Sequence, residues 1–383
     1  MAQAFSNMVA HFDLDSFFAS VEFIDAPELK QKAVIVGGHH ERGIVTTCSY
    51  EARKFGVHSA MPMKTALRLC PHAIVIPGNY AKYSHYSHWV TEIISSRAPL
   101  FEKASIDEFY IDLQGMQRFF DPLKWTMDLR ALITSETGLP ISFGIGKNKM
   151  IAKMATNEAK PNGYLQVAEG MEKEFLAPLH IEKIPGVGEQ TRRILHYHGF
   201  RYIGDVQRVD PGAVEKILGN WGIDLWNKAQ ANYHSVIQSY HESKSISREQ
   251  TFESNVTDLF YMKRQLVNMV EHVAFSLRKD ERFACCISIK IRYYDFETVS
   301  RQIRIMPTDA DDEMIPVINE LFDKLHKKDR PVRLLGVKLS EFVTHAIQPS
   351  LFRDVQKKSG LYKAIDDLKN RYGKTSVNRA SGQ

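Results

Sequence analysis

The sequence contains little cysteine, no long apolar run and no internal repeat. Four cysteines occur in 383 residues, and none lies in a Cys-x-x-Cys pair or beside histidines at zinc-ligand spacing. This excludes a disulfide scaffold and a structural zinc module, and we expect reduced thiols in a cytoplasmic protein. No stretch reaches the roughly 18 consecutive apolar residues of a membrane span. Residues 1–7 lack the charged and apolar regions of a signal peptide. We therefore expect neither a membrane span nor a signal peptide.

A strong charge of one sign is also missing, since the formal net charge is only +5. The excess lies in residues 236–383, where 25 Lys and Arg stand against 20 Asp and Glu, whereas the preceding part is balanced. A polyanionic partner is therefore indicated for the last part of the chain. The length indicates about two to four domains, and the apolar content is sufficient for several cores.

Apolar periodicity predicts an α+β chain with several domains. In the first part we expect a buried strand at 9–13, a strand-turn-strand at 101–113 and a helix at 149–160. From about 171 short helices are separated by glycines, and a polar linker follows. The next segment has the order β-α-β-β-α-β, which is the split-βαβ (ferredoxin-like) arrangement, and the tail from about 353 is expected to be flexible.

Acidic residues occur at the ends of expected buried strands. Asp13 and Asp15 end the first strand, and residues i and i+2 of a strand face the same side. Carboxylates in such a place suit Mg²⁺, although a helix cap at Asp15 and a surface turn at Asp13 explain them equally well. Asp107 and Glu108 are neighbours, so both reach one metal site only at a turn or bulge. An ordinary solvated turn is the alternative.

Two further segments suggest phosphate binding. Tyr50 and Arg53 share a helix face and could grip a triphosphate, or simply lie on a surface helix. The Ile-Pro-Gly-Val-Gly sequence at 184–188 opens a helix, as in helix-hairpin-helix modules, where Gly186, Gly188 and the following Arg192 would hold a DNA phosphate. A tight turn between helices is the alternative.

In the last domain, basic residues alternate with apolar ones along the expected strands. One sheet face should therefore be apolar and the other polar and basic, with Lys290, Arg292, Arg304 and Lys338 on the polar face. A solvated face is common, but this basic bias also fits DNA phosphates. After the last strand, Gln348, Leu351 and Phe352 form a possible docking peptide, unless Phe352 packs back onto the domain.

Taken together, the motifs resemble the Y-family translesion DNA polymerases of the bacterial DNA polymerase IV type. They follow the family's order over about 8–352, and several motifs in order are more specific than any single one. The matching segments are FDLDSFFASVE at 12–22, SYEARKFGV at 49–57, ASIDEFYID at 104–112, SFGIGKNK at 142–149, AKPNG at 159–163 and IPGVG at 184–188.

The resemblance implies a right-hand polymerase with an added domain. Its parts would be a palm at 1–20 and 80–170, fingers at 21–79, a helical thumb at 171–235, a linker at 236–244, a ferredoxin-like little finger at 245–345 and a tail at 346–383. The tail would carry the sliding-clamp peptide, Gln348 to Phe352.

The resemblance also implies roles for individual residues. Asp13, Asp107 and Glu108 match the catalytic carboxylates that hold two Mg²⁺ ions, and Leu14 matches a carbonyl ligand. Phe18 matches the steric gate, the aromatic ring that excludes a ribose 2′-hydroxyl. Residues matching the deoxynucleoside triphosphate contacts are Phe17, Phe18, Thr47, Tyr50, Arg53 and Lys160.

The implied function is error-prone, template-directed addition of deoxynucleotides to a primer 3′ end by a monomer. The expected partners are primer-template DNA, deoxynucleoside triphosphates and a sliding clamp, with no membrane. One alternative is a DNA- and clamp-binding protein without catalysis, which would not need the three carboxylates. Another is a palm-like nucleotidyl cyclase, which would not need the glycine-rich hairpin or the basic last domain.

Overall fold

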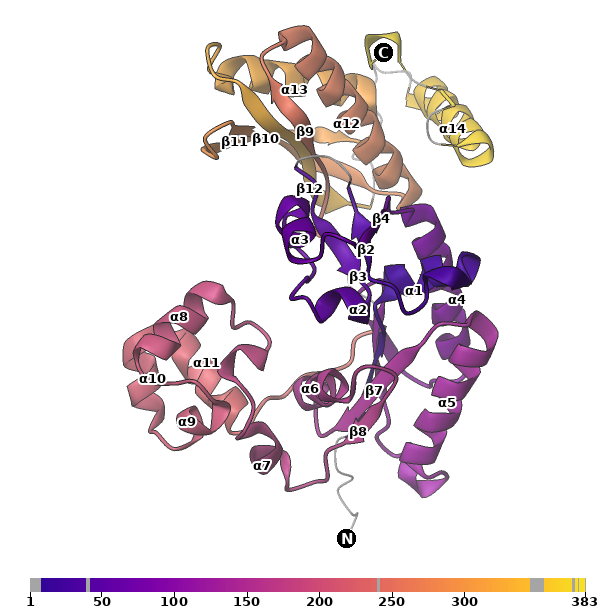
Figure 1. Cartoon of the computed structure of the whole chain (residues 1–383). Helices are drawn as coiled ribbons and strands as arrows, with labels where there is room; N and C mark the ends of the chain where they lie inside the picture. The colour runs from indigo at the N-terminus through magenta and orange to yellow at the C-terminus, as the bar shows by residue number, and fades with distance from the viewer. Residues whose placement is uncertain are drawn as a thin grey trace. The chain divides into compact units, whose positions relative to one another are not determined.

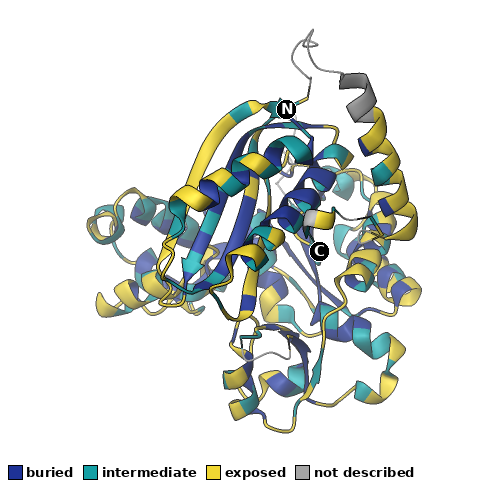
Figure 2. Ribbon diagram, turned by 90° about the horizontal axis from the view of Figure 1, so that it is seen from above, coloured by how far each residue is buried: buried dark blue, intermediate teal, exposed yellow. Residues whose placement is uncertain are grey.

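The computed structural model describes residues 8–38, 42–239, 242–344, 355–373, 376–377 and 379–382. The chain forms two compact units, Met1–His241 and Glu242–Gln383, which are described separately (Figure 1). In both units the buried residues lie on the strands and on the inner sides of the helices (Figure 2). No helix in these described ranges is long and apolar enough to cross a membrane.

A five-stranded sheet forms the centre of the first unit, with β1 in its middle. Its order is β5-β6-β1-β7-β8, and β1 is antiparallel to both of its neighbours. All residues of β1 are buried, as expected for a strand with a layer on each face. The strands are β1 (Val9–Leu14), β5 (Phe101–Lys103), β6 (Glu108–Asp112), β7 (Ile141–Gly146) and β8 (Tyr164–Gln166).

The two-residue period of β1 assigns its side chains to two layers. Ala10, Phe12 and Leu14 join an apolar core with side chains from α4 (Tyr80–Ser95) and α5 (Pro122–Thr137). His11 and Asp13 face α6 (Lys149–Ala159) and the residue after it. The chain leaves β1 through Ser16, which has a left-handed φ of 45°, and enters α1 (Phe17–Asp25). Asp13 is therefore on the α6 side of the sheet.

Gly144 allows α6 to lie close to the sheet. A Cβ atom at this position would be 2.3 Å from the Ala152 carbonyl oxygen and 2.4 Å from the Thr156 nitrogen. Since these are backbone atoms, the helix would have to move. Gly144→Ala should therefore lower the free energy of unfolding by about 3 kcal/mol, measured by urea denaturation. Gly212→Ala is the control, because open space surrounds that helical glycine; a loss as large as that of Gly144→Ala would contradict the packing argument.

A smaller sheet, β3-β2-β4, has its own apolar core. It lies within residues 21–79, the range expected for the fingers, and carries short helices on either side of a turn containing Gly56 and Pro62. Its strands and helices are β2 (Val34–Gly37), β3 (Val45–Cys48), α2 (Tyr50–Arg53), α3 (Met63–Leu69) and β4 (Ile74–Ile76).

Five short helices after the large sheet form a helical bundle with a third core. They are α7 (Glu172–Leu176), α8 (Glu189–Tyr197), α9 (Ile203–Gln207), α10 (Pro211–Leu218) and α11 (Asn220–Ala229). The extended segment after α11 contacts the large sheet and α6. Asn148 donates to the Tyr233 carbonyl at 2.8 Å, the Gln238 nitrogen donates to Glu102 at 2.9 Å, and Ile237 is buried.

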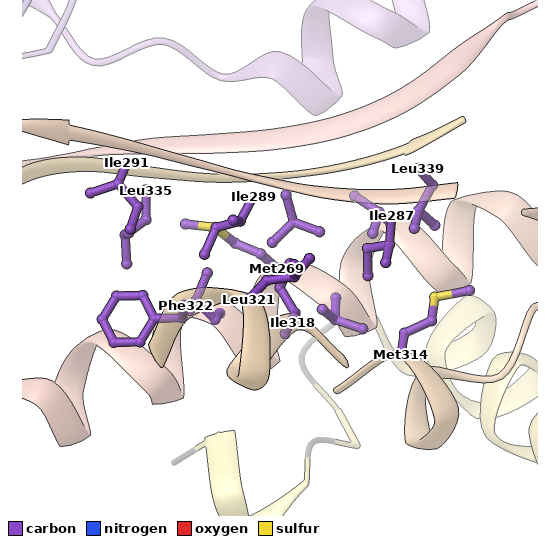
Figure 3. Close-up of a cluster of buried hydrophobic side chains, with 14 of the residues drawn as sticks. Met269, Ile287, Ile289, Ile291, Met314, Ile318, Leu321, Phe322, Leu335 and Leu339 are labelled. Carbon is purple, nitrogen blue, oxygen red and sulfur yellow. The ribbon is translucent and has the colours of Figure 1, made fainter. Parts of the chain in front are cut away.

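The second unit has the predicted order β-α-β-β-α-β. The sheet order is β11-β10-β12-β9, so each helix joins two strands that are separated by a third. Apolar side chains fill the space between the sheet and its two helices (Figure 3). The elements are β9 (Ser245–Val256), α12 (Leu259–Lys279), β10 (Phe283–Tyr293), β11 (Thr298–Thr308), α13 (Asp311–Leu325) and β12 (Val332–Val343).

The expectation of a flexible tail is wrong for residues 355–372, which form α14 (Val355–Tyr372). Arg278 of α12 donates to both carboxylate oxygens of Asp366, at 2.6 and 2.9 Å. The buried Tyr362 hydroxyl donates to Asp312 at 2.6 Å. These polar contacts fix the helix, and the sequence did not reveal them because the partners are far apart along the chain.

Candidate functional site

The pairing of β1 with β6 brings the proposed metal ligands together. Asp13 is directly opposite Glu108 in the register, and Asp107 immediately precedes β6. The Leu14 nitrogen donates to the Asp107 carbonyl at 3.1 Å. The three carboxylates therefore come from one end of two adjacent strands.

The turn required by the sequence is present between β5 and β6. Ser105 Oγ accepts from the nitrogens of Asp107 and Glu108, at 3.3 and 3.1 Å, and donates to Asp107 Oδ1 at 2.5 Å. The chain is thus irregular until Glu108, where β6 begins. Adjacent residues in a regular strand would point to opposite faces, so this turn is what lets both serve one site.

Two lysines pair with two of the three carboxylates. Lys160 forms an ion pair with Asp13, and Lys153 Nζ is 2.7 Å from each carboxylate oxygen of Glu108. Lys160 was predicted as a triphosphate contact, whereas Lys153 was missed. The sequence signal was that both lysines fall within the helix expected at 149–160, although Lys160 in fact directly follows α6.

Burial and the lysines act in opposite directions on the acidic groups. Burial raises the pKa of Asp13 to about 7, with the nearby Asp107 and Glu108 charges adding to it and Lys160 opposing it. Burial also favours protonation of Glu108, but the nearby His11 and the hydrogen bonds and charge of Lys153 outweigh it and hold its pKa at about 2. A further cation nearby would favour the ionised form of Asp13.

His11 lies beneath Glu108 and is fully buried. Its Nδ1 is 2.8 Å from Thr156 Oγ1, and its Nε2 is 3.9 Å from Glu108 Oε2 without another partner. Burial lowers the pKa of His11, which favours a neutral ring. Thr156 Oγ1 also lies 2.9 Å from the carbonyl oxygens of His11 and Ala152, to which it can donate its one proton.

Asp15 and Asp112 are excluded from the carboxylate group by their contacts. Asp15 is buried and accepts from Ser142 Oγ at 2.8 Å, the Asn162 nitrogen at 2.7 Å and Tyr50 Oη at 3.3 Å. Asp112 pairs with Val9 at the opposite end of β6. Asp15 therefore ties together the segments around the site.

A pocket adjoins the carboxylates and contains most of the expected nucleotide contacts. Its lining includes Asp13, Leu14, Phe17, Phe18, Thr47, Arg53, Asp107 and Lys160. The guanidinium of Arg53 lies over the Tyr50 ring, 4.9 Å from its centre, although Tyr50 itself does not line the pocket. The first turn of α1 also faces this pocket through Phe17 and Phe18, and a helix N-terminus favours anions.

Phe18, the expected steric gate, is held by a stacked ring. The rings of Phe18 and Tyr83 are 4.2 Å apart and 12° from parallel. Tyr83 is buried and donates its hydroxyl to Glu22 at 2.6 Å. Because Tyr83 fixes one face of Phe18, the ring has little freedom to move away from a bulky neighbour.

The predicted glycine turn precedes α8. Gly186 has a left-handed φ of 101°, and Gly188 is the residue before the helix. Ile184 and Val187 are buried in the core of the bundle, which leaves the turn backbone at the surface. Arg192 bonds to Glu189 of its own helix at 2.8 Å, an exposed pair that a phosphate could replace at little cost.

The four basic residues predicted for the last domain share the sheet face opposite the helices. Lys290 pairs with Gly336, and Lys338 pairs with Ser288, so these side chains project to the same side. The strand registers place Arg292 and Arg304 on this same side of the sheet. The core isoleucines Ile287, Ile289 and Ile291 point the other way (Figure 3). Two acids reduce the positive charge of this face, because Glu249 pairs with Lys290 and Glu341 pairs with Arg304.

The oxygen donors fit a divalent cation such as Mg²⁺. Carboxylates at one strand end, with no sulfur or free imidazole among them, are ligands of a hard cation. Within the part of the chain that the structure describes, no three His, Cys, Asp or Glu side chains converge as a metal site. The cause is visible in the geometry, since Asp13 and Glu108 are turned towards lysines. The proposed clamp residues Gln348, Leu351 and Phe352 lie outside the described residues.

Comparisons with known proteins agree in sequence and in structure. The profile of the impB/mucB/samB family matches residues 12–157, and that of the family's C-terminal domain matches residues 243–351. The DNA polymerase IV of Dehalococcoides mccartyi (strain CBDB1) is 38% identical over 96% of both chains. That of Desulfatibacillum aliphaticivorans is 37% identical over 98% of this chain and 96% of its own.

Solved structures extend the similarity to the fold. A Y-family DNA polymerase chimera, Dbh-Dpo4(243-245)-Dbh, has a TM-score of 0.77 at 27% identity, covering 88% of this chain and 100% of its own. The insertion ternary complex of Dbh DNA polymerase has a TM-score of 0.64 at the same identity and coverage.

Proposed function

As a member of the impB/mucB/samB family, the chain is a Y-family translesion DNA polymerase, and we propose that Asp13, Asp107 and Glu108 hold its two Mg²⁺ ions. The observation that carries this proposal is the register of β1 and β6, which brings the three carboxylates to one strand end beside a pocket. Leu14 would add its backbone carbonyl. The relatives and structural neighbours are polymerases, which argues against a non-catalytic DNA-binding protein and gives no support to a cyclase.

The proposed reaction joins a primer 3′ end to an incoming deoxynucleotide. Asp13, Asp107 and Glu108 would hold and orient two divalent ions. Such ions would supply the acidity needed to deprotonate the primer hydroxyl and positive charge for the leaving pyrophosphate. Positive and hydrogen-bonding groups bind the triphosphate, and the aromatic ring of Phe18 excludes ribonucleotides. These triphosphate-binding groups are Thr47, Tyr50, Arg53, Lys160 and the first amides of α1.

A primer-extension assay tests this proposal most simply. With Mg²⁺, primer-template and all four deoxynucleoside triphosphates, the chain should extend the primer on an undamaged template and past an abasic position. Primer extension that does not depend on a template would support another nucleotidyltransferase reaction. Binding of DNA without any extension would support the non-catalytic alternative.

We further propose that DNA is held by two surfaces that do not read base sequence. The turn at Gly186 and Gly188 offers backbone amides to a phosphate, with Arg192 beside it. In the second unit, Lys290, Arg292, Arg304 and Lys338 supply cations on one sheet face. Because such contacts release counterions, DNA binding should weaken steeply with salt.

Lys338→Ala tests the sheet face, because this side chain is exposed there. We expect weaker binding of every DNA sequence and a salt slope of log Kd against log salt reduced by about 0.9, as for one phosphate contact. Fluorescence anisotropy over a salt series measures both. Arg301→Ala is the matched control, because Arg301 is opposite Ile289 and thus on the other side of the same sheet. Equal effects of the two variants would reject the assignment of the DNA surface.

We also propose a sliding clamp as partner, bound through Gln348, Leu351 and Phe352. Support comes from the resemblance of this segment to clamp-binding peptides. Deletion of residues 348–352 should remove stimulation of extension by a clamp and leave the rate without clamp unchanged. Persistent stimulation would reject this peptide as the docking site.

A monomer in the cytoplasm is our proposal for the working state. All four cysteines are free thiols, which agrees with a reducing compartment. Size-exclusion chromatography with light scattering tests the monomer.

A further inference from the structure

Two lysines on one face of α6, and Lys160 directly after the helix, pair with acids of the five-stranded sheet. The four-residue spacing of Lys149 and Lys153 keeps those two on one side of the helix. The pairs are Lys149 with Glu102, Lys153 with Glu108 and Lys160 with Asp13. Two of the three acids are proposed metal ligands, and only Lys160 has a role in the function proposed above.

The ammonium group of Lys153 contacts both oxygens of the Glu108 carboxylate. Lys153 Nζ is 2.7 Å from both oxygens, and both side chains are largely shielded, with 28% and 21% exposure. His11 lies on the other side, 3.9 Å from Oε2. Asp107, in contrast, has no ion pair with a lysine among the described residues; its side chain accepts from Ser105. Glu108 is therefore the ligand most fully held by the protein.

Neither Lys153 nor Glu108 lines the pocket beside the carboxylates, whereas Asp13, Asp107 and Lys160 do. In a two-ion displacement, the attacking and leaving oxygens are on opposite sides of the transferred phosphorus. If the pocket holds the triphosphate, we expect the primer strand to end nearer Glu108 and Lys153.

We propose that Lys153 is an internal counter-cation that occupies Glu108 until a phosphate of the primer strand binds the lysine and frees the carboxylate. This inference rests on the proposed function. The ammonium group and a divalent ion repel each other and need the same oxygens, so both cannot be accommodated fully. DNA binding therefore increases the affinity for the ion, and the ion increases the affinity for DNA by the same factor.

Ion binding to the full chain tests this coupling without any turnover. Free Mn²⁺ is measured by electron paramagnetic resonance, with and without a dideoxy-terminated primer-template and without nucleotide. For the unmodified chain, DNA should lower the Kd for Mn²⁺ about tenfold, a typical allosteric factor. Lys153→Met should bind Mn²⁺ about tenfold more tightly without DNA, and DNA should add little further.

Lys149→Met is the matched control. It removes a similar lysine one turn earlier on the same helix face, whose partner Glu102 is outside the carboxylate group. This variant should keep both the weak ion binding and the tightening by DNA. If Lys153→Met melts far below the unmodified chain, Lys153→Gln replaces it, because its amide can still hydrogen-bond Glu108 without a charge.

The proposal is overturned if both neutral variants at Lys153 bind Mn²⁺ as the unmodified chain does, or if DNA tightens their binding by the full factor. Failure of the proposed function has a different signature. If Glu108→Gln changes neither Mn²⁺ binding nor primer extension, Glu108 is no metal ligand at all. If Glu108→Gln changes both Mn²⁺ binding and primer extension, but the Lys153 variants change neither, only the role of Lys153 as a counter-cation is rejected.

Discussion

Asp107→Ala and Glu108→Ala should each lower the rate of nucleotide addition by roughly 10³-fold or more. Each removes a proposed ligand of the ions, whose stabilisation of the transition state is worth several kcal/mol, and each 1.36 kcal/mol is tenfold in rate. Binding of primer-template should survive, because the DNA-holding surfaces proposed at Gly186 and on the sheet of the second unit are unchanged. In Glu108→Ala, Lys153 also loses its carboxylate partner and stays available to a primer phosphate. Single-turnover primer extension and fluorescence anisotropy measure the two quantities.

Asp112→Ala is the control for these variants. It removes a carboxylate from the same strand, but at the end that pairs with Val9, away from the site. Its rate should remain near that of the unmodified chain. Near-normal extension by either Asp107→Ala or Glu108→Ala would contradict the assignment of the metal ligands.

Phe18→Ala should increase incorporation of ribonucleotides relative to deoxynucleotides by roughly a hundredfold. Discrimination against an added hydroxyl needs a rigid obstacle, since a soft apolar pocket rejects it only weakly. Tyr83 supplies that rigidity by stacking on the ring at 4.2 Å. The ratio of kcat/KM for the two nucleotides is the measurement.

Tyr83→Phe provides the matched comparison for the gate. It keeps the stacked ring and removes only the hydrogen bond to Glu22. Selectivity against ribonucleotides should therefore be almost unchanged. Unaltered selectivity in Phe18→Ala would reject Phe18 as the gate, whatever Tyr83→Phe does.

Local patterns were sufficient for much of the fold and for the position of the carboxylates. The strands at 9–14 and 108–112 are short buried runs, and the sheet face with Lys290 and Lys338 follows from the two-residue period. The turn before Glu108 followed from a geometric need, because adjacent carboxylates on a regular strand cannot serve one site.

Features that depend on contacts between distant segments were not predictable. The role of Lys153 depends on which strand α6 covers, and that of His11 depends on the depth of its burial. Asp15 has the spacing of a metal ligand, but the structure ties it to Ser142 and Asn162. The tail helix docks through Asp366 and Tyr362, whose partners precede them by 88 and 50 residues.

The number of ions bound in a stalled complex tests most directly whether Asp13, Asp107 and Glu108 hold two metal ions. The complex contains the chain, a dideoxy-terminated primer-template and a non-hydrolysable deoxynucleotide, and bound Mn²⁺ is counted by electron paramagnetic resonance. We expect about two ions per complex, as in other two-metal sites. In Asp107→Ala, fewer ions should be bound while the DNA stays bound. An unchanged number of ions in Asp107→Ala, or no ion in the unmodified complex, would contradict this assignment.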